Sequence, residues 1–130
     1  MVIDASALIA ILLDEAEGEG FGQLIVDSQV RLLGAVSWLE AGIVAESRLG
    51  RRGTDRLEQL LAKLGPDIVG FTIEHAKLAL EAWRRFGKGR HPAALNFGDC
   101  CTYALCRATG EPLLAKGVDF PRTDVKLVRA

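Results

Sequence analysis

The sequence lacks an excess of charge of either sign. Its 16 Lys and Arg residues nearly balance 17 Asp and Glu residues, so the net charge is −1 over 130 residues. This balance argues against a protein that binds nucleic acid through overall positive charge, as histones do. A nucleic-acid enzyme is compatible with it only if basic residues are concentrated at one place.

Long apolar runs are also missing. No stretch approaches the 18 consecutive apolar residues of a membrane-spanning helix. The amino-terminal apolar run is interrupted by Asp4 and has no basic region before it, so it does not match a secretory signal. We therefore expect a cytoplasmic protein with no membrane contact. With 49% hydrophobic and 25% charged residues, the chain is predicted to fold as a single domain over residues 1–130.

Cysteine occurs only three times, at Cys100, Cys101 and Cys106. An odd number within one short stretch does not match a disulfide framework, and no His stands at zinc-ligand spacing beside them. We expect reduced thiols that pack in the core as small apolar side chains.

Short apolar runs alternate with amphipathic segments along the chain. This alternation predicts an α/β fold with a parallel sheet. The expected strands are residues 1–3, 30–36, 68–71, 112–115 and 125–128. The expected helices are residues 5–13, 20–28, 37–49, 54–64, 74–86 and 99–109, with Ser37 opening the third and Thr54 capping the fourth.

Four acidic residues lie close to the ends of these elements: Asp4, Glu40, Asp99 and Asp119. Functional groups of parallel α/β sheets gather at the carboxyl ends of the strands, so the four carboxylates are predicted to converge at one edge. Each acid also has a structural alternative. Asp4 and Asp99 suit helix caps, Ser37 and Glu40 match a capping box, and Asp119 suits an ordinary turn.

Apolar neighbours distinguish these acids from ordinary surface residues. Asp4 follows Val2 and Ile3, and Glu40 follows Trp38 and Leu39. Carboxylates in apolar surroundings are costly to bury unless they are paired or bind a cation. No matching set of Lys or Arg lies beside them in the sequence, so the pattern favours a bound metal ion.

Four segments of the chain together resemble the PIN-domain family, and in particular the VapC toxins of bacterial toxin–antitoxin pairs. They are Met1–Leu8, Ser37–Glu40, Leu95–Cys100, and Pro112–Phe120 with Thr123 and Asp124. They occur in order at the family's spacing, and the resemblance runs from residue 2 to about residue 128. The fourth segment departs from the family at Val118, where a second polar or acidic residue is common.

The resemblance implies a three-layer α/β/α PIN-like fold with a central parallel sheet. It also implies an endoribonuclease that hydrolyses RNA phosphodiester bonds, in tRNA or rRNA, with a water activated by Mg²⁺ or by Mn²⁺ in its place. The residues that match the family's catalytic and metal-binding quartet are Asp4, Glu40, Asp99 and Asp119. Ser6 and Asn96 match supporting positions, and Asp124 is an alternative to Asp119.

A basic stretch precedes the third of these segments. It contains Arg84, Arg85, Lys88 and Arg90. One interpretation is a solvated helix end, since cations favour helix carboxyl termini. The other is a loop that binds RNA phosphates beside the acids, which would reconcile a nearly neutral chain with an RNA substrate.

The resemblance also implies two protein partners, a cognate VapB-like antitoxin that blocks the site and a second copy of the chain in a homodimer. Apolar residues are expected to supply both a groove for the antitoxin and the core, and most of them are expected to be simply core: Leu8, Leu12, Phe21, Leu24, Ile43, Leu57 and Leu60. Two other functions stay open at this point. One is a structure-specific DNA nuclease, and the other is a catalytically silent PIN-like binding module whose acids only cap helices.

Overall fold

The computed structural model describes residues 1–128, and its centre is a sheet of four short strands. The strands are β1 (Val2–Ile3), β2 (Leu32–Gly34), β3 (Asp67–Val69) and β4 (Leu113–Leu114). They lie in the order β3-β2-β1-β4, and every neighbouring pair is parallel. The predicted parallel α/β sheet is therefore confirmed.

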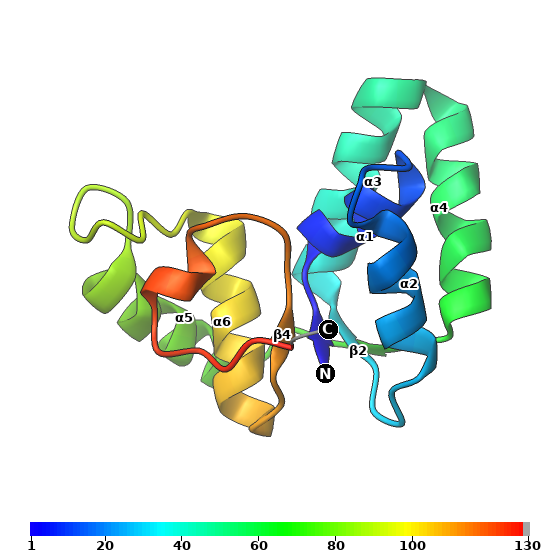
Figure 1. Ribbon diagram of the computed structural model, residues 1–130. Helices are drawn as coiled ribbons and strands as arrows, with labels where there is room; N and C mark the ends of the chain where they lie inside the picture. Colours follow the sequence, from blue (N-terminus) through cyan, green and yellow to red (C-terminus); the bar gives the residue numbers. More distant parts are fainter. Residues whose placement is uncertain (129–130) are drawn as a thin grey trace.

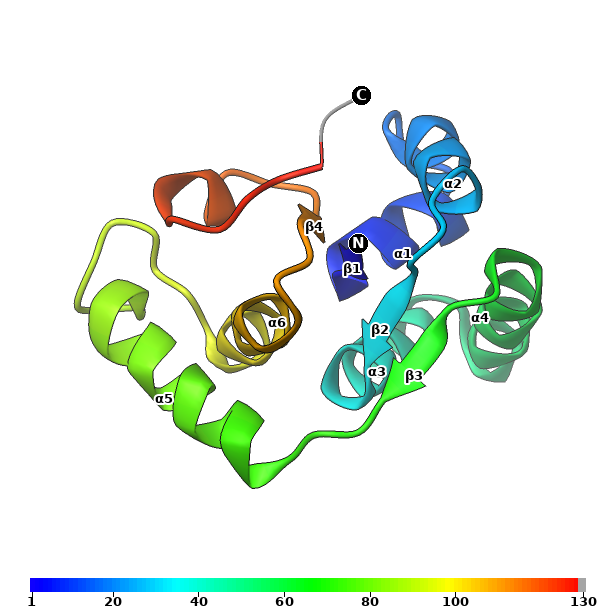
Figure 2. The same ribbon diagram turned by 90° about the horizontal axis from the view of Figure 1, so that it is seen from below.

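The six α-helices of the described residues are divided between two layers, one on each side of this sheet (Figures 1 and 2). One layer contains α1 (Ala5–Leu12), α2 (Gly18–Val26), α3 (Ala35–Leu49) and α4 (Arg51–Leu64). The other contains α5 (Ile73–Phe86) and α6 (Phe97–Thr109), which pack extensively on each other. This arrangement confirms the expected three-layer α/β/α fold.

β1 and β4 are apolar on both faces because each face carries a layer of helices. Side chains alternate between the faces of a strand. In β1, Ile3 joins the hydrophobic cluster of α1 to α4, whereas Val2 joins the cluster of α5 and α6. In β4, Leu114 and Leu113 divide in the same way. All four side chains are at most 2% exposed, so β1 and β4 are deeply buried.

Several predicted boundaries shift by a few residues. Helix α3 begins at Ala35 after Gly34, so Ser37 lies inside the helix and does not cap it. Helix α4 begins at Arg51, directly after Gly50, so the predicted cap at Thr54 is wrong. The Thr54 hydroxyl instead donates to Glu46 on α3 at 3.1 Å. The expected strand 125–128 reduces to a single bridge between Leu127 and Leu113.

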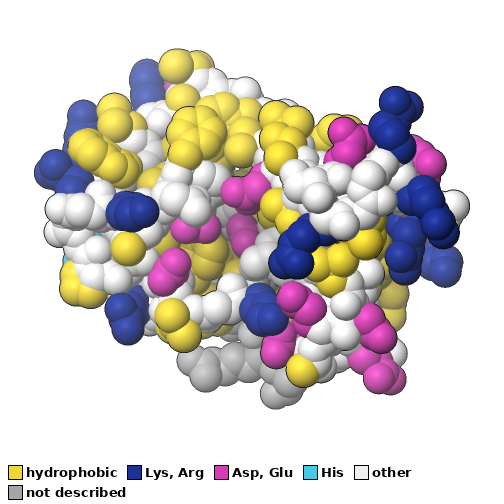
Figure 3. Space-filling model, turned by 90° about the horizontal axis from the view of Figure 1, so that it is seen from above, with side chains coloured by type: hydrophobic (Ala, Val, Ile, Leu, Met, Phe, Trp, Pro, Cys, Tyr) yellow, Lys and Arg dark blue, Asp and Glu magenta, His cyan; other side chains and the backbone are white. Residues whose placement is uncertain are grey.

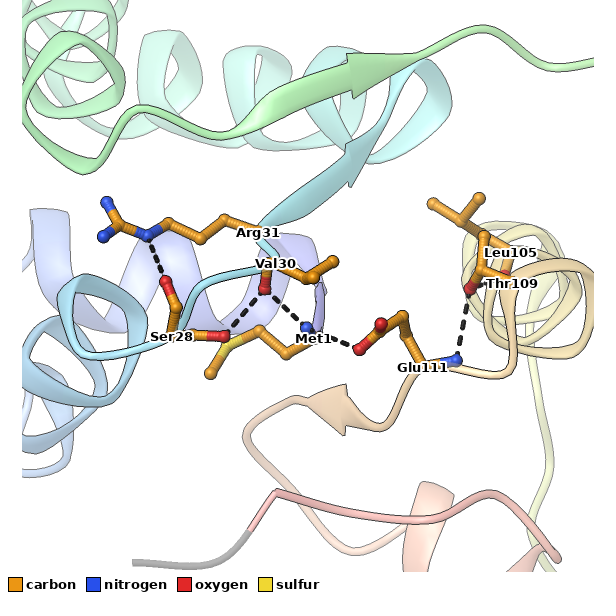
Figure 4. A network of polar contacts seen from close by, with 7 residues as sticks. All are labelled: Met1, Ser28, Val30, Arg31, Leu105, Thr109 and Glu111. Atoms are coloured by element: carbon orange, nitrogen blue, oxygen red, sulfur yellow. Dashed lines mark hydrogen bonds and ion pairs between the residues drawn. The ribbon is translucent and has the colours of Figure 1, made fainter.

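Polar contacts connect the amino ends of the strands (Figure 4). The Met1 amino group donates to the Val30 carbonyl at 2.6 Å and to the Glu111 carboxylate at 2.9 Å. The Ser28 hydroxyl donates to the same Val30 carbonyl, at 2.8 Å. These contacts fasten β1 to the segments that lead into β2 and β4, at the pole opposite the strands' carboxyl ends.

The three cysteines are free and buried, as expected for reduced core residues. Burial raises the pKa of Cys100 to about 11 and that of Cys106 to about 12, so these thiols are poor nucleophiles at neutral pH. Within residues 1–128, none of the helices has both the length and the apolar character needed to cross a membrane.

Candidate acidic site

The strand order places a topological switch point between β1 and β4. From β1 the chain proceeds to β2 and β3 on one side and then returns to β4 on the other. A crevice at the carboxyl ends of such strands is the usual ligand position of open α/β sheets. Asp4 directly follows β1, and Asp119 lies in the loop after β4. Figure 3 looks onto this end of the molecule and shows acidic side chains gathered around a hollow near its middle.

Asp4 is the most buried of the four acids, with 4% of its surface exposed. It is the N-cap of α1, where its Oδ2 accepts a hydrogen bond from the Ser6 backbone N–H at 3.0 Å. Its Oδ1 accepts a second one from the Thr102 hydroxyl at 2.8 Å. The capping role expected as an alternative is therefore real, and it orients the carboxylate toward the site.

Glu40 lies in the second turn of α3 and is half-buried. The capping box with Ser37 is not formed, since the Ser37 hydroxyl bonds Thr102 instead. The Glu40 carboxylate lies against Gly98 of α6, where any Cβ atom would overlap it. Burial, followed by the negative charges of Asp4 and Asp99, raises the pKa of Glu40.

Asp99 lies in the first turn of α6 and forms a reciprocal capping box with Asn96. The Asp99 carboxylate accepts from the Asn96 backbone N–H at 3.1 Å, and the Asn96 side-chain oxygen accepts from the Asp99 N–H at 2.9 Å. Burial raises the pKa of Asp99 to about 6, and the charges of Asp4 and Asp119 add to this against the Asn96 hydrogen bond. Asn96 thus supports the site by fixing Asp99.

Asp119 is exposed and immediately precedes the short 3₁₀ helix η1 (Phe120–Arg122). It makes no side-chain capping bond there, and it reaches the site through its charge effect on Asp99. Its loop is anchored at Lys116, whose backbone N–H donates to the Ser6 hydroxyl at 2.9 Å. The Lys116 ammonium also pairs with Glu15 and Glu17 at 3.0 and 3.1 Å.

Asp124, the alternative to Asp119, is engaged elsewhere. Its carboxylate accepts hydrogen bonds from the Tyr103 hydroxyl at 2.5 Å and from Arg85 at 3.1 Å. The Tyr103 hydrogen bond is the main cause that lowers the pKa of Asp124. Asp124 therefore ties the carboxyl-terminal segment to α5 and α6, while Asp119 remains the acid of this loop that acts on the site.

The basic stretch is only partly available to a ligand. The Arg84 guanidinium lies 3.4 Å from the Glu81 carboxylate, and the Arg85 guanidinium pairs with the Asp124 carboxylate. The Arg90 guanidinium lies over the Trp83 ring at 4.7 Å. Lys88 forms no ion pair within the described residues, and it lines a groove together with Asn96 and Phe97. Of the four basic residues, Lys88 is thus the one left without an ion-pair or aromatic partner within the described residues.

The donor set fits a hard divalent cation, because Mg²⁺ and Mn²⁺ prefer carboxylate oxygens. None of the four acids forms an ion pair within the part of the chain that the structure describes. Across residues 1–128, however, no three His, Cys, Asp or Glu side chains already stand in an arrangement that would hold a metal ion. The carboxylates influence one another by charge, and a cation would have to draw them closer together.

The sequence did not predict two residues of this site. Ser37 was expected only as a helix cap and not as a buried hydrogen-bond partner, and Thr102 was not expected at all. Their hydroxyl oxygens lie 3.1 Å apart, and Thr102 continues to Asp4. A signal was present, since Thr102 lies three residues after Asp99 and Ser37 three residues before Glu40. Residues at this spacing share a helix face.

Comparison with known proteins places this site in a family. A model of the PIN domain matches residues 1–126. The ribonuclease VapC of Mycolicibacterium smegmatis is 46% identical over 128 residues, which cover 98% of this chain and 99% of that protein. The ribonuclease VapC30 of Mycobacterium tuberculosis is 43% identical over 128 residues, which cover 98% of each chain.

The same architecture occurs in a solved structure. The crystal structure of VapC20 from Mycobacterium tuberculosis, described as a sarcin–ricin loop cleaving toxin, has a TM-score of 0.78 with this chain. The match covers 99% of this chain and 98% of VapC20 at 20% sequence identity, which shows a shared fold. Sequence and fold agree, and the chain belongs to the PIN domain family, among the VapC ribonucleases.

Proposed function

We propose that this chain is a Mg²⁺-dependent endoribonuclease, with Mn²⁺ as an alternative ion, and the toxin of a VapBC-type toxin–antitoxin pair. The observation that carries the proposal is the mutual effect of the acids at the switch point. Burial raises the pKa of both Glu40 and Asp99, the charge of Asp4 raises both further, and Asp119 adds to the effect on Asp99. Carboxylates that repel one another without a neighbouring cation are suited to bind one.

Each acid has a role that follows from its place. Asp4 and Asp99, which the helix amino termini hold in fixed orientations, are the principal metal ligands in this proposal. Glu40 and Asp119 complete the set or orient the attacking water. A divalent cation there supplies Lewis-acid stabilisation of the charge that develops on the phosphate. Lys88, which forms no ion pair within the described residues, binds a phosphate of the RNA.

The test compares Asp4→Asn with Asp55→Asn, a matched control that removes one carboxylate from the exposed face of α4. Asparagine at residue 4 can still cap α1, so the fold should be retained. We expect the wild type and Asp55→Asn to cut single-stranded RNA with Mg²⁺ and to leave flap DNA intact. Asp4→Asn should lose cleavage by about 100-fold or more, with an unchanged circular dichroism spectrum.

Three results would contradict the proposal. Cleavage retained by Asp4→Asn would show that this acid is not required. Preferential cutting of flap DNA would favour a structure-specific DNA nuclease. Failure of the wild type to bind Mn²⁺ in isothermal titration would favour a silent binding module, whose acids only cap helices.

We also propose a second copy of the chain as a partner, on the face formed by α3, α5 and the start of α6. A groove of about 490 Å³ lies there, lined in part by Leu80, Trp83 and Phe97. A second groove of about 390 Å³, lined by Leu39 and Ile43, meets it at Phe97. Phe97 is 79% exposed, and a continuous apolar surface of this kind is typical of protein interfaces.

Light scattering should give a dimer for the wild type, and Trp83→Glu should give a monomer. A monomeric wild type would contradict this assignment.

The antitoxin partner is proposed from the VapC relatives. Most of the apolar residues expected to supply its groove and the core are core residues, as expected, since Leu8, Leu12 and Leu57 are buried. Phe21, Leu24 and Leu60 pack against the same core. We propose that a VapB-like protein blocks the acidic hollow directly. Co-expression with a VapB-like antitoxin should give a stable complex without ribonuclease activity, and an active complex would contradict this mode of inhibition.

A further inference from the structure

Two buried hydroxyl groups lie beneath the acidic site. Ser37 of α3 is 3% exposed and Thr102 of α6 is 2% exposed. With Asp4, which is 4% exposed, they are the buried polar residues of the described chain. Polar groups are buried in such a core only with a compensating hydrogen bond. These three residues provide it for one another, across three separate elements of the fold.

The hydrogen bonds have one consistent direction. The Thr102 hydroxyl donates its single proton to Asp4 Oδ1 at 2.8 Å. The contact of 3.1 Å between the two hydroxyl oxygens must then use the Ser37 proton, so Ser37 donates to Thr102. The result is a directed chain from Ser37 through Thr102 to Asp4.

The helical spacing places this hydroxyl chain under the other acids. Ser37 precedes Glu40 by three residues on α3, and Thr102 follows Asp99 by three residues on α6. Residues three apart lie on the same face of a helix, one turn from each other. Each hydroxyl therefore lies one turn below an acid of the site, and the pair connects both acid-bearing helices to Asp4.

We propose that Thr102, supported by Ser37, is a positioning residue that sets the Asp4 carboxylate for a divalent cation. This inference rests on the proposed metal-dependent function. Asp4 accepts one hydrogen bond on each oxygen, from Thr102 on Oδ1 and from the Ser6 N–H on Oδ2. Two such bonds fix the rotation of the carboxylate, and a carboxylate with about four lone-pair sites keeps the remaining ones for a metal ion.

The energetic expectation follows from how metal sites use outer hydrogen bonds. Partners that orient a ligand are worth about 10–100-fold in metal affinity. Thr102→Val keeps the shape of the side chain and removes the donor, whereas Thr102→Ser keeps the donor and removes a methyl group. Ser37→Ala removes only the outer donor and leaves the Thr102 bond to Asp4. The effects on metal affinity should therefore decrease from Thr102→Val through Ser37→Ala to Thr102→Ser.

The experiment measures Mn²⁺ affinity of the full chain by isothermal titration, with the metal-free melting temperature of each variant measured beside it. We expect Thr102→Val to weaken Mn²⁺ binding by about 10–100-fold. Thr102→Ser should stay close to wild type, which is rescue by the conservative variant. Ser37→Ala should weaken binding by a few-fold. Because it leaves the hydrogen bond from Thr102 to Asp4 in place, it also tests the hydroxyl chain if Thr102→Val does not fold.

The outcomes separate this inference from the proposed function. A wild type that does not bind Mn²⁺ overturns the metal-dependent function itself. If the wild type binds Mn²⁺, and Thr102→Val and Ser37→Ala bind it with the same affinity as the wild type but have lower melting temperatures, only the positioning role is overturned. Weakening by Thr102→Ser as large as by Thr102→Val would assign the effect to packing of the methyl group and would likewise overturn it.

Discussion

Asp4 combines two functions that are often treated as alternatives. As the N-cap of α1 it satisfies the backbone N–H of Ser6, and in the same position it faces Glu40 and Asp99. A cap holds a carboxylate at the amino end of a helix, where the helix dipole favours negative charge. Asp99 is held in the same way by its capping box with Asn96. Structural capping here is therefore how the fold orients the acids.

The pKa of Asp99 gives a first prediction at this scale. It is raised from 3.8 to about 6, so the folded chain holds this proton more tightly than the unfolded chain does. The resulting stability is present below pH 3.8 and is lost as the pH rises through about 6. Asp99→Asn removes the repulsion and keeps an oxygen for the Asn96 N–H. At pH 7.5 without metal it should raise the melting temperature by on the order of 3–5 °C per kcal/mol of relieved repulsion.

The pH series carries the control for this prediction. Near pH 4 the wild-type carboxyl group is largely protonated and Asp99→Asn should melt close to the wild type. Asp55→Asn, outside the site, should follow the wild type at both pH values. A melting temperature of Asp99→Asn below that of the wild type at pH 7.5 would show that Asp99 stabilises the metal-free fold, contrary to the expected repulsion.

Gly98 gives a second prediction, because the Glu40 carboxylate occupies the space where a Cβ would lie. Gly98→Ala should displace the flexible end of Glu40 and lower RNA cleavage by about 10-fold or more, as ångström-scale misplacement in active sites does. Gly42→Ala on α3 is the matched control, since nothing lies within 4 Å of its Cβ position. Equal activity of the two variants in a cleavage assay would show that the position of Glu40 is not critical.

The same residues show what sequence could and could not reveal. The four acids were predicted because each lies in a segment with a recognisable local pattern. Ser37 was misassigned because a Ser followed by Glu three residues later is also the pattern of a capping box. The helix actually begins two residues earlier, at Ala35. Thr102 was missed because its partner Asp4 lies 98 residues away in the chain, and only its helical spacing from Asp99 marks it.

At the scale of elements, the order of strands and helices followed from sequence, whereas their ends did not. The strands have only two or three residues, so pairing with neighbours decides their limits more than composition does. Gly50 ends α3 as predicted, with a positive φ of 69°. Helix α4 then starts at once without a side-chain cap, which is why Thr54 was wrongly chosen as its beginning.

The joint between α3 and α4 gives a third prediction. Gly53 allows the two helices to approach closely, since a Cβ there would overlap the Ala45 carbonyl group. Gly-to-Ala changes inside exposed helices normally stabilise by about 1 kcal/mol. Gly53→Ala should instead destabilise by about 1–3 kcal/mol, because the backbone must move apart. Urea unfolding beside Gly42→Ala measures the difference, and a gain in stability for Gly53→Ala would contradict the close approach.

At the scale of the whole molecule, parallel topology explains why acids far apart in sequence meet. All strands end at the same pole, and the switch point between β1 and β4 leaves a crevice there. The convergence was therefore predictable from the alternation of elements. Whether the basic residues are free to bind a ligand was not predictable, because Arg85 and Arg90 contact Asp124 and Trp83, which lie outside the basic stretch. A nearly neutral chain thus holds a concentrated acidic pole.

That concentration of charge predicts how the whole fold responds to divalent ions. A ligand that binds only the folded chain stabilises it by RT ln(1 + [L]/Kd), about 2.7 kcal/mol at 100 times Kd. Mn²⁺ should therefore raise the melting temperature of the wild type and of Asp55→Asn by several degrees, and a chelator should reverse the rise. Asp4→Asn should show little change. Sodium chloride at equal ionic strength separates binding from general screening of the acids. An equal rise in the melting temperature of Asp4→Asn would show that the ion binds away from the switch point. Removing the Asp4 carboxylate, the most buried of the four, would then have no effect on ion binding.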